Sequence, residues 1–529
     1  MAILNFKGKA FVQNYHLQVK YHQLIPRKNK SLTKKVSLHD NLIIHGDNLK
    51  ALKALLPTYA GKIKCIYIDP PYNTGNEKWA YNDNVNSPMM QDWLGKVVDK
   101  EDLTRHDKWL CIMMPRLKLL KELLSQDGVI CISIDDIELG RLLTIMDDLF
   151  GEENKEEVVA WRRRHNQPND KSKPISKVAE FLVVYAKDLE YLKKNKGFQG
   201  IPLTGNFTNP DNDPRGDWAS KPWKAGSNQT GSRYKIKSPS GKIYDEEWLG
   251  TRETYDALLA DGRIYFSSDN SLPRKKYYKS ERQEEGQCAH NFWNHKEFGS
   301  NQEASKEISE IGLDFDNPKP TRLVKGILTI FSKSNSIILD SFSGSGTTAH
   351  SVLALNAEDD GNRQFILVEC EDYADKITAE RVRRVIKGVP KAKDENLKKG
   401  LGGTFSYFDL GPPIEMEEIL SGDNFPSYED LARYVFYTAT GEEFDPDVVN
   451  EKKNFIGESA QYLVYLFYKP DIEYLKATAL TLDRAKALGA YKKKRRLVFA
   501  PTKYLDQEHL DELRIDFAQL PFEIYQLVK

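Results

Sequence analysis

Short apolar segments alternate with helix-like segments along this 529-residue chain, and this alternation constrains its fold more than any other feature. Strands are expected at 42–45, 63–68, 129–134 and 179–186, with helices at 49–56, 109–124 and 137–149 between them. Strand–helix–strand units of this length are typical of a parallel sheet. The pattern resumes with a strand at 336–340, a glycine turn, a helix to about residue 356 and a strand at 364–369. We therefore expect an α/β core that is built from two separate segments of the chain.

Two stretches depart from this alternation. Residues 195–316 are rich in glycine, proline, asparagine and serine, which favours a loop-rich, mainly β insertion. A linker near residue 391 leads to a region with strands expected at 461–468 and 496–501 and a helix near 472–489. We therefore expect a basic N-terminal arm, a core in two halves, an insertion and a C-terminal domain, at 1–38, 39–194, 195–316, 317–390 and 391–529.

Overall charge limits the classes of partner. The 77 Lys and Arg residues balance 77 Asp and Glu residues, which excludes a uniformly basic surface for nucleic acid but allows a locally basic cleft. Residues 1–40 are basic, as in a solvated tail or a contact for phosphates, whereas residues 411–460 are strongly acidic. No window approaches the ~18 uncharged apolar residues of a membrane span, and the first residues lack the apolar segment of a signal peptide. We expect a cytoplasmic protein with no membrane contact.

The motif Asp69-Pro70-Pro71-Tyr72 directly follows the strand expected at 63–68. Open α/β sheets bind ligands at the carboxyl ends of their strands, so this position favours a site. The two prolines fix the backbone and lack N–H donors, which leaves carbonyl groups free to accept hydrogen bonds. A carboxylate, a rigid carbonyl and an aromatic ring suit an exocyclic amino group on a planar base. They offer acceptors for its two hydrogens and a ring on which the base can stack.

A second motif, Asp340 to Thr348, lies between the strand at 336–340 and a helix, and contains Phe342, Gly344 and Gly346. It lacks the third glycine of a dinucleotide fingerprint and the lysine of a P-loop, which disfavours a triphosphate. Glu369 ends the next strand, where a carboxylate typically binds ribose hydroxyls. The motif therefore favours a nucleoside such as S-adenosylmethionine, and an ordinary strand–helix turn is the alternative.

In this order, the two motifs resemble those of the β-class amino DNA methyltransferases. The segments 46–48, 68–76 and 317–321 are most similar to the modification subunits of type III restriction–modification systems. The resemblance covers about residues 39–390, and residues 425–529 in outline. It implies a permuted Rossmann-like core that uses S-adenosyl-L-methionine, an inserted target-recognition domain and a C-terminal α+β domain.

The resemblance also implies roles for single residues. Asp69 and the carbonyl of Pro70, held by Pro71, would accept hydrogen bonds from the target amino group, and Tyr72 would stack on the flipped base. Phe342 would pack against the cofactor, Gly344 and Gly346 would admit its methionine end, and Glu369 would hold its ribose. The pocket would be completed by Asp47, Asp340, Lys319, Pro320 and Thr321.

The implied activity is sequence-specific methylation of adenine N6 in double-stranded DNA by base flipping, without a metal. A homodimer is expected, with a restriction (helicase–nuclease) subunit as a further partner. N4-cytosine methylation is the alternative within the class, since the same acceptors suit that amino group. A non-catalytic DNA-binding specificity subunit is the alternative from another class, and intact Asp69, Tyr72 and Phe342 argue against it.

Three weaker features allow two interpretations each. The basic run at 161–165 is either a phosphate contact or a solvated surface. Cys288, His290 and His295 could hold zinc, but no fourth ligand has suitable spacing, so metal is disfavoured. The aromatic residues at 462–468 form either an interface or an ordinary core strand.

Overall fold

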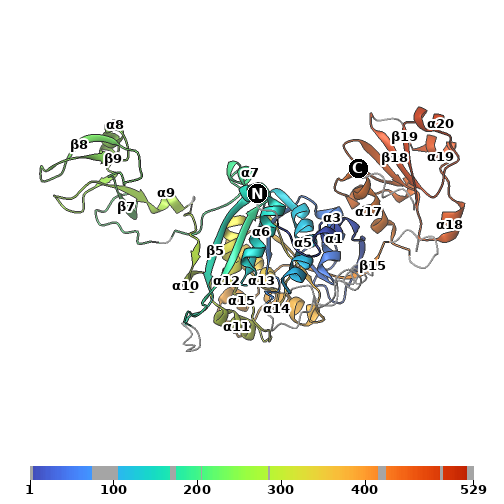
Figure 1. Cartoon of the computed structure of the whole chain (residues 1–529), viewed down its shortest axis with the longest axis horizontal. Coiled ribbons are helices and arrows are strands. Elements are labelled where there is room, and N and C mark those ends of the chain that lie inside the picture. The colour runs from blue at the N-terminus through green and yellow to red at the C-terminus, as the bar shows by residue number, and fades with distance from the viewer. Residues whose placement is uncertain are drawn as a thin grey trace. The chain divides into compact units, whose positions relative to one another are not determined.

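The computed structural model describes residues 4–73, 105–166, 174–203, 205–283, 286–414, 425–488 and 493–520. It divides into two compact units (Figure 1). The larger unit contains residues 1–198 and 291–529. Residues 199–290 form the smaller one, here called the inserted unit, which lies within the insertion expected at 195–316. Within the described residues, no helix is both long and apolar enough to cross a membrane.

A ten-stranded sheet is the centre of the larger unit. Its strands in spatial order are β1 (His22–Pro26), β15 (Ser406–Pro413), β2 (Leu42–His45), β14 (Gln364–Glu369), β13 (Ile337–Asp340), β3 (Ile63–Ile68), β4 (Leu124–Ile134), β6 (Ala179–Ala186), β5 (Lys155–Arg162) and β12 (Phe292–Trp293). The strands from β15 to β4 are parallel, as the alternation of strands and helices predicts. β1 pairs antiparallel with β15, and β6 pairs antiparallel with both β4 and β5.

The central strands β3 and β14 are mainly apolar on both faces, and they are buried because helices cover the sheet. One core joins strand residues such as Ile44, Ile66 and Ile132 to three helices that pack together, α3 (Asn48–Tyr59), α5 (Arg105–Leu123) and α6 (Leu139–Phe150). A second set of packed helices comprises α12 (Thr321–Phe331), α13 (Thr347–Asp359) and α14 (Glu380–Lys387). This parallel sheet with its helices is the Rossmann-like fold expected from the sequence.

Segments from both ends of the chain extend the sheet. The N-terminal arm forms α1 (Lys9–Val12), α2 (Tyr15–Gln18) and β1, and it buries Val12 and Leu24 in the main core. β15, which follows the linker expected near residue 391, pairs with β2. The arm is therefore packed on the core and is not a solvated tail.

The C-terminal part has its own four-stranded sheet. Its strands are β16 (Phe455–Glu458), β17 (Tyr462–Leu466), β18 (Arg495–Ala500) and β19 (Ile515–Gln519), and α17 (Tyr428–Thr440) packs on them. Tyr465 and Tyr468 are buried in its two cores, so the aromatic segment at 462–468 is an ordinary core strand. The single helix expected near 472–489 is wrong: α18 (Ile472–Ala477) and α19 (Leu482–Ala487) are separated by a buried extended segment, where Leu480 bridges to Lys503.

The inserted unit consists of two small sheets and two described helices. β10 (Ile264–Tyr265), β11 (Arg274–Tyr278) and β7 (Trp218–Pro222) form one sheet in that order, and β8 (Ser232–Lys237) pairs with β9 (Ile243–Trp248) in the other. The helices are α8 (Arg252–Ala260) and α9 (Lys279–Gln283). Its core contains Trp223, Ile236, Trp248, Tyr255 and Ile264.

Candidate active site

Four neighbouring parallel strands end at one edge of the main sheet, and each ends in or beside an acidic residue. Asp69 follows β3, Asp340 ends β13, Glu369 ends β14, and Asp47 lies just beyond β2. The strand register aligns these ends, since Ile338 pairs with Cys65 and Glu369 pairs with His45. The two motifs, far apart in the sequence, therefore meet at the edge where α/β sheets bind ligands.

Asp69 accepts a hydrogen bond on each carboxylate oxygen. The hydroxyl of Tyr72 donates to Oδ1 at 2.7 Å, and the ammonium of Lys319 donates to Oδ2 at 2.5 Å. Lys319 Nζ also lies 2.9 Å from the Tyr72 hydroxyl and 5.0 Å from the centre of its ring. The sequence assigned Lys319 to the cofactor pocket, whereas its ammonium group contacts the expected catalytic pair.

A buried glutamate completes this cluster. Glu180 on β6 lies 3.6 Å from Lys319 Nζ, accepts a hydrogen bond from Tyr72 at 3.3 Å, and forms an ion pair with Arg163 at 2.9 Å. Burial acts to lower the pKa of Lys319, but the carboxylates of Asp69 and Glu180 outweigh it, so the pKa lies above its ordinary value. The cluster therefore contains two carboxylates and two cations, with Lys319 protonated at neutral pH.

The backbone after Asp69 is held by groups from two other segments. The indole of Trp109 on α5 donates to the carbonyl of Pro71 at 2.8 Å. Asn73 has a left-handed backbone conformation (φ 58°), and its amide donates to the fully buried Glu138, which His106 also contacts. These contacts fix the direction of the motif. The continuation of the expected match, residues 74–76, lies outside the described residues.

The glycine turn after β13 is organised by Asp340. Its carboxylate accepts hydrogen bonds from the backbone N–H of Phe342 at 3.0 Å and from the hydroxyl of Thr348 at 2.5 Å. Burial raises the pKa of Asp340 to about 7 against the effect of these donors. Gly344 and Gly346 adopt left-handed conformations (φ 49° and 78°), which a residue with a side chain rarely adopts.

Glu369 connects the ends of β14 and β13. One oxygen accepts from the N–H of Gly344 at 2.7 Å, and the other accepts from the N–H groups of Cys370 and Glu371 at 2.9 and 3.1 Å. Burial raises the pKa of Glu369 to about 7, although these three donors favour the carboxylate. Asp47 instead caps α3, accepting from the N–H groups of Leu49 and Lys50.

The pocket residues at the start of α12 bind protein groups. Pro320 precedes the helix, and Thr321 donates from its N–H and hydroxyl to Glu307 at 3.0 and 2.8 Å. The hydroxyl of Thr347 donates to the carbonyl of Lys319 at 3.1 Å, which ties this segment to the glycine turn. The structure thus brings Asp47, Lys319, Asp340, Phe342 and Glu369 to one edge of the sheet, while Thr321 supports them.

Sequence reasoning missed Glu180 and Glu138, and it considered Arg163 only as a phosphate contact or a solvated residue. Glu180 carried a signal, because a single acid in the apolar strand AEFLVVYA must find a partner when the strand is buried. Arg163 belongs to the basic run at 161–165 and pairs with Glu180, so this member of the run is not a free phosphate contact. Glu138 gave no comparable signal.

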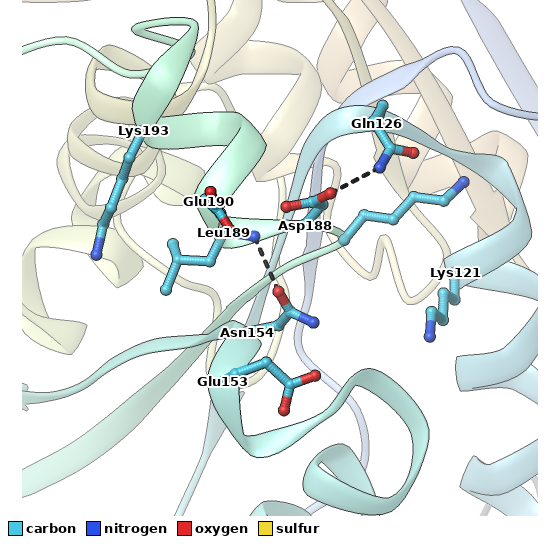
Figure 2. Close-up of a pocket in the computed structure, with 9 residues that line it drawn as sticks. Lys121, Gln126, Glu153, Asn154, Asp188, Leu189, Glu190 and Lys193 are labelled. Atoms are coloured by element: carbon cyan, nitrogen blue, oxygen red, sulfur yellow. Dashed lines mark hydrogen bonds between the residues drawn. The ribbon is translucent and has the colours of Figure 1, made fainter.

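Other candidate features lie away from this edge. The pocket in Figure 2 is lined by Lys121, Gln126, Asn154, Asp188 and others, near the start of β4 and the end of β6, at the opposite edge of the sheet. Among the described residues, no group of three or more His, Cys, Asp or Glu side chains could hold a metal ion.

Comparison with known proteins assigns the family. The model of the DNA methylase family, which covers N6 and N4 methyltransferases, matches residues 63–380. The type III StyLTI Mod subunit of Salmonella typhimurium is 31% identical, with 83% of this chain and 70% of that protein aligned. The EcoP15I Mod subunit of Escherichia coli is 28% identical, with coverages of 70% and 64%. The type II methyltransferase M.KpnI of Klebsiella pneumoniae is 30% identical, with coverages of 61% and 79%.

The matched part of this chain thus spans about two thirds of the length of the two Mod subunits. The family match begins at the first residue of β3 and ends in α14, so it contains both motifs and the strands that carry them. The chain therefore belongs to the DNA methylase family.

Proposed function

We propose that this chain transfers a methyl group from S-adenosyl-L-methionine to the N6 atom of adenine at a specific site in duplex DNA. We propose further that it is the modification subunit of a type III-like restriction–modification system. The observation that carries the proposal is the meeting of the Asp69–Tyr72–Lys319 cluster and the Phe342–Glu369 turn at one edge of a parallel sheet. The similarity to Mod subunits supports the assignment to a type III system.

The residues at the glycine turn fit this cofactor. The Glu369 carboxylate can accept hydrogen bonds from ribose hydroxyls, and its pKa of about 7 leaves it largely ionised in mildly alkaline solution. The hydroxyl of Ser341 is buried and has no hydrogen-bond partner among the described residues, so a polar ligand group could satisfy it. Phe342 follows Ser341 in the sequence and is nearly buried in the main core, where its ring would meet the cofactor only at its small exposed part. The cofactor supplies a methyl group on a sulfonium, which a nitrogen lone pair can attack.

The chain's contribution to the reaction is to orient the target amino group. The N6 lone pair of adenine is delocalised into the ring, and acceptors for both N6 hydrogens favour a pyramidal nitrogen with a localised lone pair. The Asp69 carboxylate has about four acceptor positions, and Tyr72 and Lys319 use one on each oxygen. The remaining positions, with the Pro70 carbonyl, can accept from the amino group.

The base must leave the duplex to reach Asp69. The ring of Tyr72 offers a stacking surface, and its hydroxyl bond to Asp69 fixes the ring beside the acceptor. Lys319 Nζ lies at the hydroxyl end of this ring, so it does not cover the surface on which the flipped base would stack. Stacking replaces part of the base-pair stacking that flipping disrupts.

Replacement of Asp69 tests the catalytic assignment. Asp69→Ala should lower the rate of methyl transfer by about 100-fold or more, because one preorganised transition-state contact is typically worth this much. Cofactor binding should be largely retained in titration calorimetry, since Asp69 does not belong to the glycine turn. Near-normal turnover in this variant would remove Asp69 from the mechanism, and failure of the wild-type chain to bind the cofactor would favour a non-catalytic specificity subunit.

The target base is a separate part of the proposal. Family usage pairs Asp-Pro-Pro-Tyr more often with adenine, but the same acceptors suit the N4 amino group of cytosine. Methylation-sensitive sequencing of DNA from cells that express this chain would identify the modified base and the recognition site together. N4-methylcytosine at a fixed site would replace adenine in the proposal and leave the roles of the site residues intact.

A homodimer is the proposed assembly, with a restriction subunit as a further partner. One insertion must select a site and grip DNA, whereas specific interfaces commonly bury about 1,000–2,500 Å² of protein surface. If two copies divide recognition and catalysis, an Asp69→Ala chain mixed with a recognition-defective chain should restore some methylation. A monomer in light scattering that is fully active on DNA would contradict the dimer.

A further inference from the structure

Both faces of the β10–β11–β7 sheet in the inserted unit carry cations. The two faces differ in whether these cations form salt bridges with described carboxylates. Successive residues of a strand point to opposite faces, so Tyr277 and Tyr278 on β11 lie on different sides of this sheet. Each ring lies beside two or more cations. The cations beside Tyr278 pair with carboxylates, whereas those beside Tyr277 form no salt bridge within the described part of the chain.

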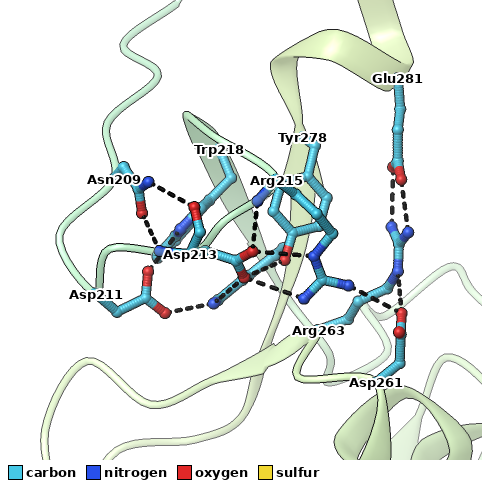
Figure 3. Close-up of polar contacts among 10 residues, drawn as sticks. Asn209, Asp211, Asp213, Arg215, Trp218, Asp261, Arg263, Tyr278 and Glu281 are labelled. Carbon is cyan, nitrogen blue, oxygen red and sulfur yellow. Dashed lines mark hydrogen bonds and ion pairs between the residues drawn. The ribbon is translucent and has the colours of Figure 1, made fainter.

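The neutralised side is shown in Figure 3. Arg215 and Arg263 lie 4.5 and 5.1 Å from the centre of the Tyr278 ring. Arg215 pairs with Asp213 and Asp261, and Arg263 pairs with Asp261 and Glu281. The cluster is completed by Lys276, which pairs with Asp211 and Asp213, and by the Tyr278 hydroxyl, which donates to Asp213 at 2.5 Å. This network holds the loop 209–215 on the sheet and leaves few cationic groups for a ligand.

On the opposite side, the cations beside Tyr277 form no salt bridge with any carboxylate that the structure describes. Lys221 and Lys275 are directly opposite each other on β7 and β11, so they share a face, and their ammonium groups lie 5.6 and 5.3 Å from the centre of the Tyr277 ring. The guanidinium of Arg282 on α9 lies 5.4 Å from the same ring. None of the three forms a salt bridge with a described residue. We call this surface, formed by Lys221, Lys275, Tyr277 and Arg282, the Tyr277 face.

The three cations of the Tyr277 face destabilise the folded protein when no ligand is bound. Like charges around one ring repel one another, and the half-buried ring of Tyr277 offsets only part of this repulsion through cation–π attraction. The neighbouring side of the same sheet shows that the fold can place carboxylates beside its cations. Unpaired cations at an exposed surface are the arrangement that a polyanion stabilises, because phosphates neutralise them and release bound counterions.

We propose that the Tyr277 face binds the phosphate backbone of the DNA substrate and anchors the inserted unit independently of sequence. The proposal rests on the DNA methyltransferase function of the chain and specifies which surface of the insertion holds DNA. The aromatic ring between the cations can pack against sugars while the cations contact phosphates. Base recognition is then left to other parts of the unit, since phosphate contacts position a protein but do not read sequence.

The test compares two triple variants of the full-length chain. K221Q/K275Q/R282Q removes the three unpaired cations. The matched control K224Q/R233Q/R252Q removes three cations of the same unit that pair with Glu246, Asp245 and Asp256. Binding of a labelled duplex of mixed sequence is measured by fluorescence anisotropy between about 50 and 200 mM salt, the range in which counterion release dominates.

Each phosphate contact contributes about −0.9 to the slope of log affinity against log salt. Loss of three contacts should therefore reduce the slope by about 2.7, so that over a fourfold rise in salt the wild type loses roughly 40-fold more affinity than the first variant. The control should keep the wild-type slope. The first variant should melt at the same temperature as the wild type or higher, because it loses mutual repulsion, and this separates the effect from misfolding.

An unchanged slope in the first variant, or an equal loss in the control, would overturn the proposal. An unchanged slope with a lower mass in light scattering would show that the Tyr277 face contacts a second copy of the chain, which also overturns it. Failure of this proposal and failure of the proposed function give different results. The salt slope measures DNA binding alone, so it tests the Tyr277 face whether or not the chain transfers methyl groups.

Discussion

Lys319→Met tests whether charge balance holds the catalytic cluster together. Lys319 is almost fully buried, and it contacts Asp69 at 2.5 Å and Glu180 at 3.6 Å. The substitution leaves two carboxylates with one cation, Arg163. Removing one partner of a buried ion pair typically destabilises a protein by about 3–5 kcal/mol, because the remaining charge lacks compensation.

Protonation of a carboxylate limits this loss, which gives the prediction a pH dependence. In the variant, one buried carboxylate is left without a cation and is held in its neutral form, so the folded state binds a proton that the unfolded state releases above about pH 4. The cost of holding that proton grows by about 1.4 kcal/mol per pH unit. The destabilisation is therefore limited to about 5 kcal/mol at pH 8 and about 2 kcal/mol at pH 5.5, and the variant approaches the wild type as pH falls.

Differential scanning calorimetry at the two pH values is the assay. With an unfolding entropy of about 2.1 cal/mol/K per residue, a unit of about 440 residues loses roughly 1 °C of Tm per kcal/mol. We expect the Tm of the larger unit to fall by roughly 3–5 °C at pH 8 and by at most about 2 °C at pH 5.5.

Two variants serve as controls. Lys319→Arg keeps the charge and should lose less stability at pH 8 than Lys319→Met. Glu180→Gln, added to Lys319→Met, removes the excess negative charge, so the double variant should be more stable at pH 8 than the sum of the single effects predicts. Equal losses of Lys319→Met at both pH values would refute the electrostatic reasoning and leave only packing to explain the effect.

Two further predictions concern the glycine turn. Glu369→Gln should weaken cofactor binding by about 10-fold or more. It replaces an acceptor for charge-assisted hydrogen bonds and places an amide donor against the N–H of Gly344. Calorimetry measures this affinity, and an unchanged value would exclude Glu369 from the site. Asp340→Asn should flatten the pH dependence of stability: because burial raises the pKa of Asp340 to about 7, the folded state holds its proton from about pH 4 to 7 and loses stability as pH rises through that range. Parallel Tm profiles of wild type and variant would contradict that assignment.

The sequence by itself determined the parts of this protein that depend on neighbouring residues. The apolar runs at 42–45, 63–68, 179–186 and 364–369 coincide with β2, β3, β6 and β14, because short runs between turn residues can bury both faces of a strand. Both motifs lie at strand ends, and parallel strands place those ends at one edge. The meeting of the two motifs at one edge of the sheet could therefore be predicted from local pattern, whereas the roles of Asp69, Tyr72 and Phe342 stay predictions.

Only the tertiary structure decided which distant groups meet there. Lys319 contacts Asp69 across 250 residues of sequence, and Glu180 reaches Tyr72 because β6 enters the sheet antiparallel beside β4. Neither contact has a local signature, since each depends on strand order and helix placement. The addition of β15 to β2 across the expected linker has the same origin. A strand edge can pair with any strand that reaches it, and a buried charge can pair with any opposite charge nearby. Which segments meet depends on how the whole chain packs, and not on the residues next to them in the sequence.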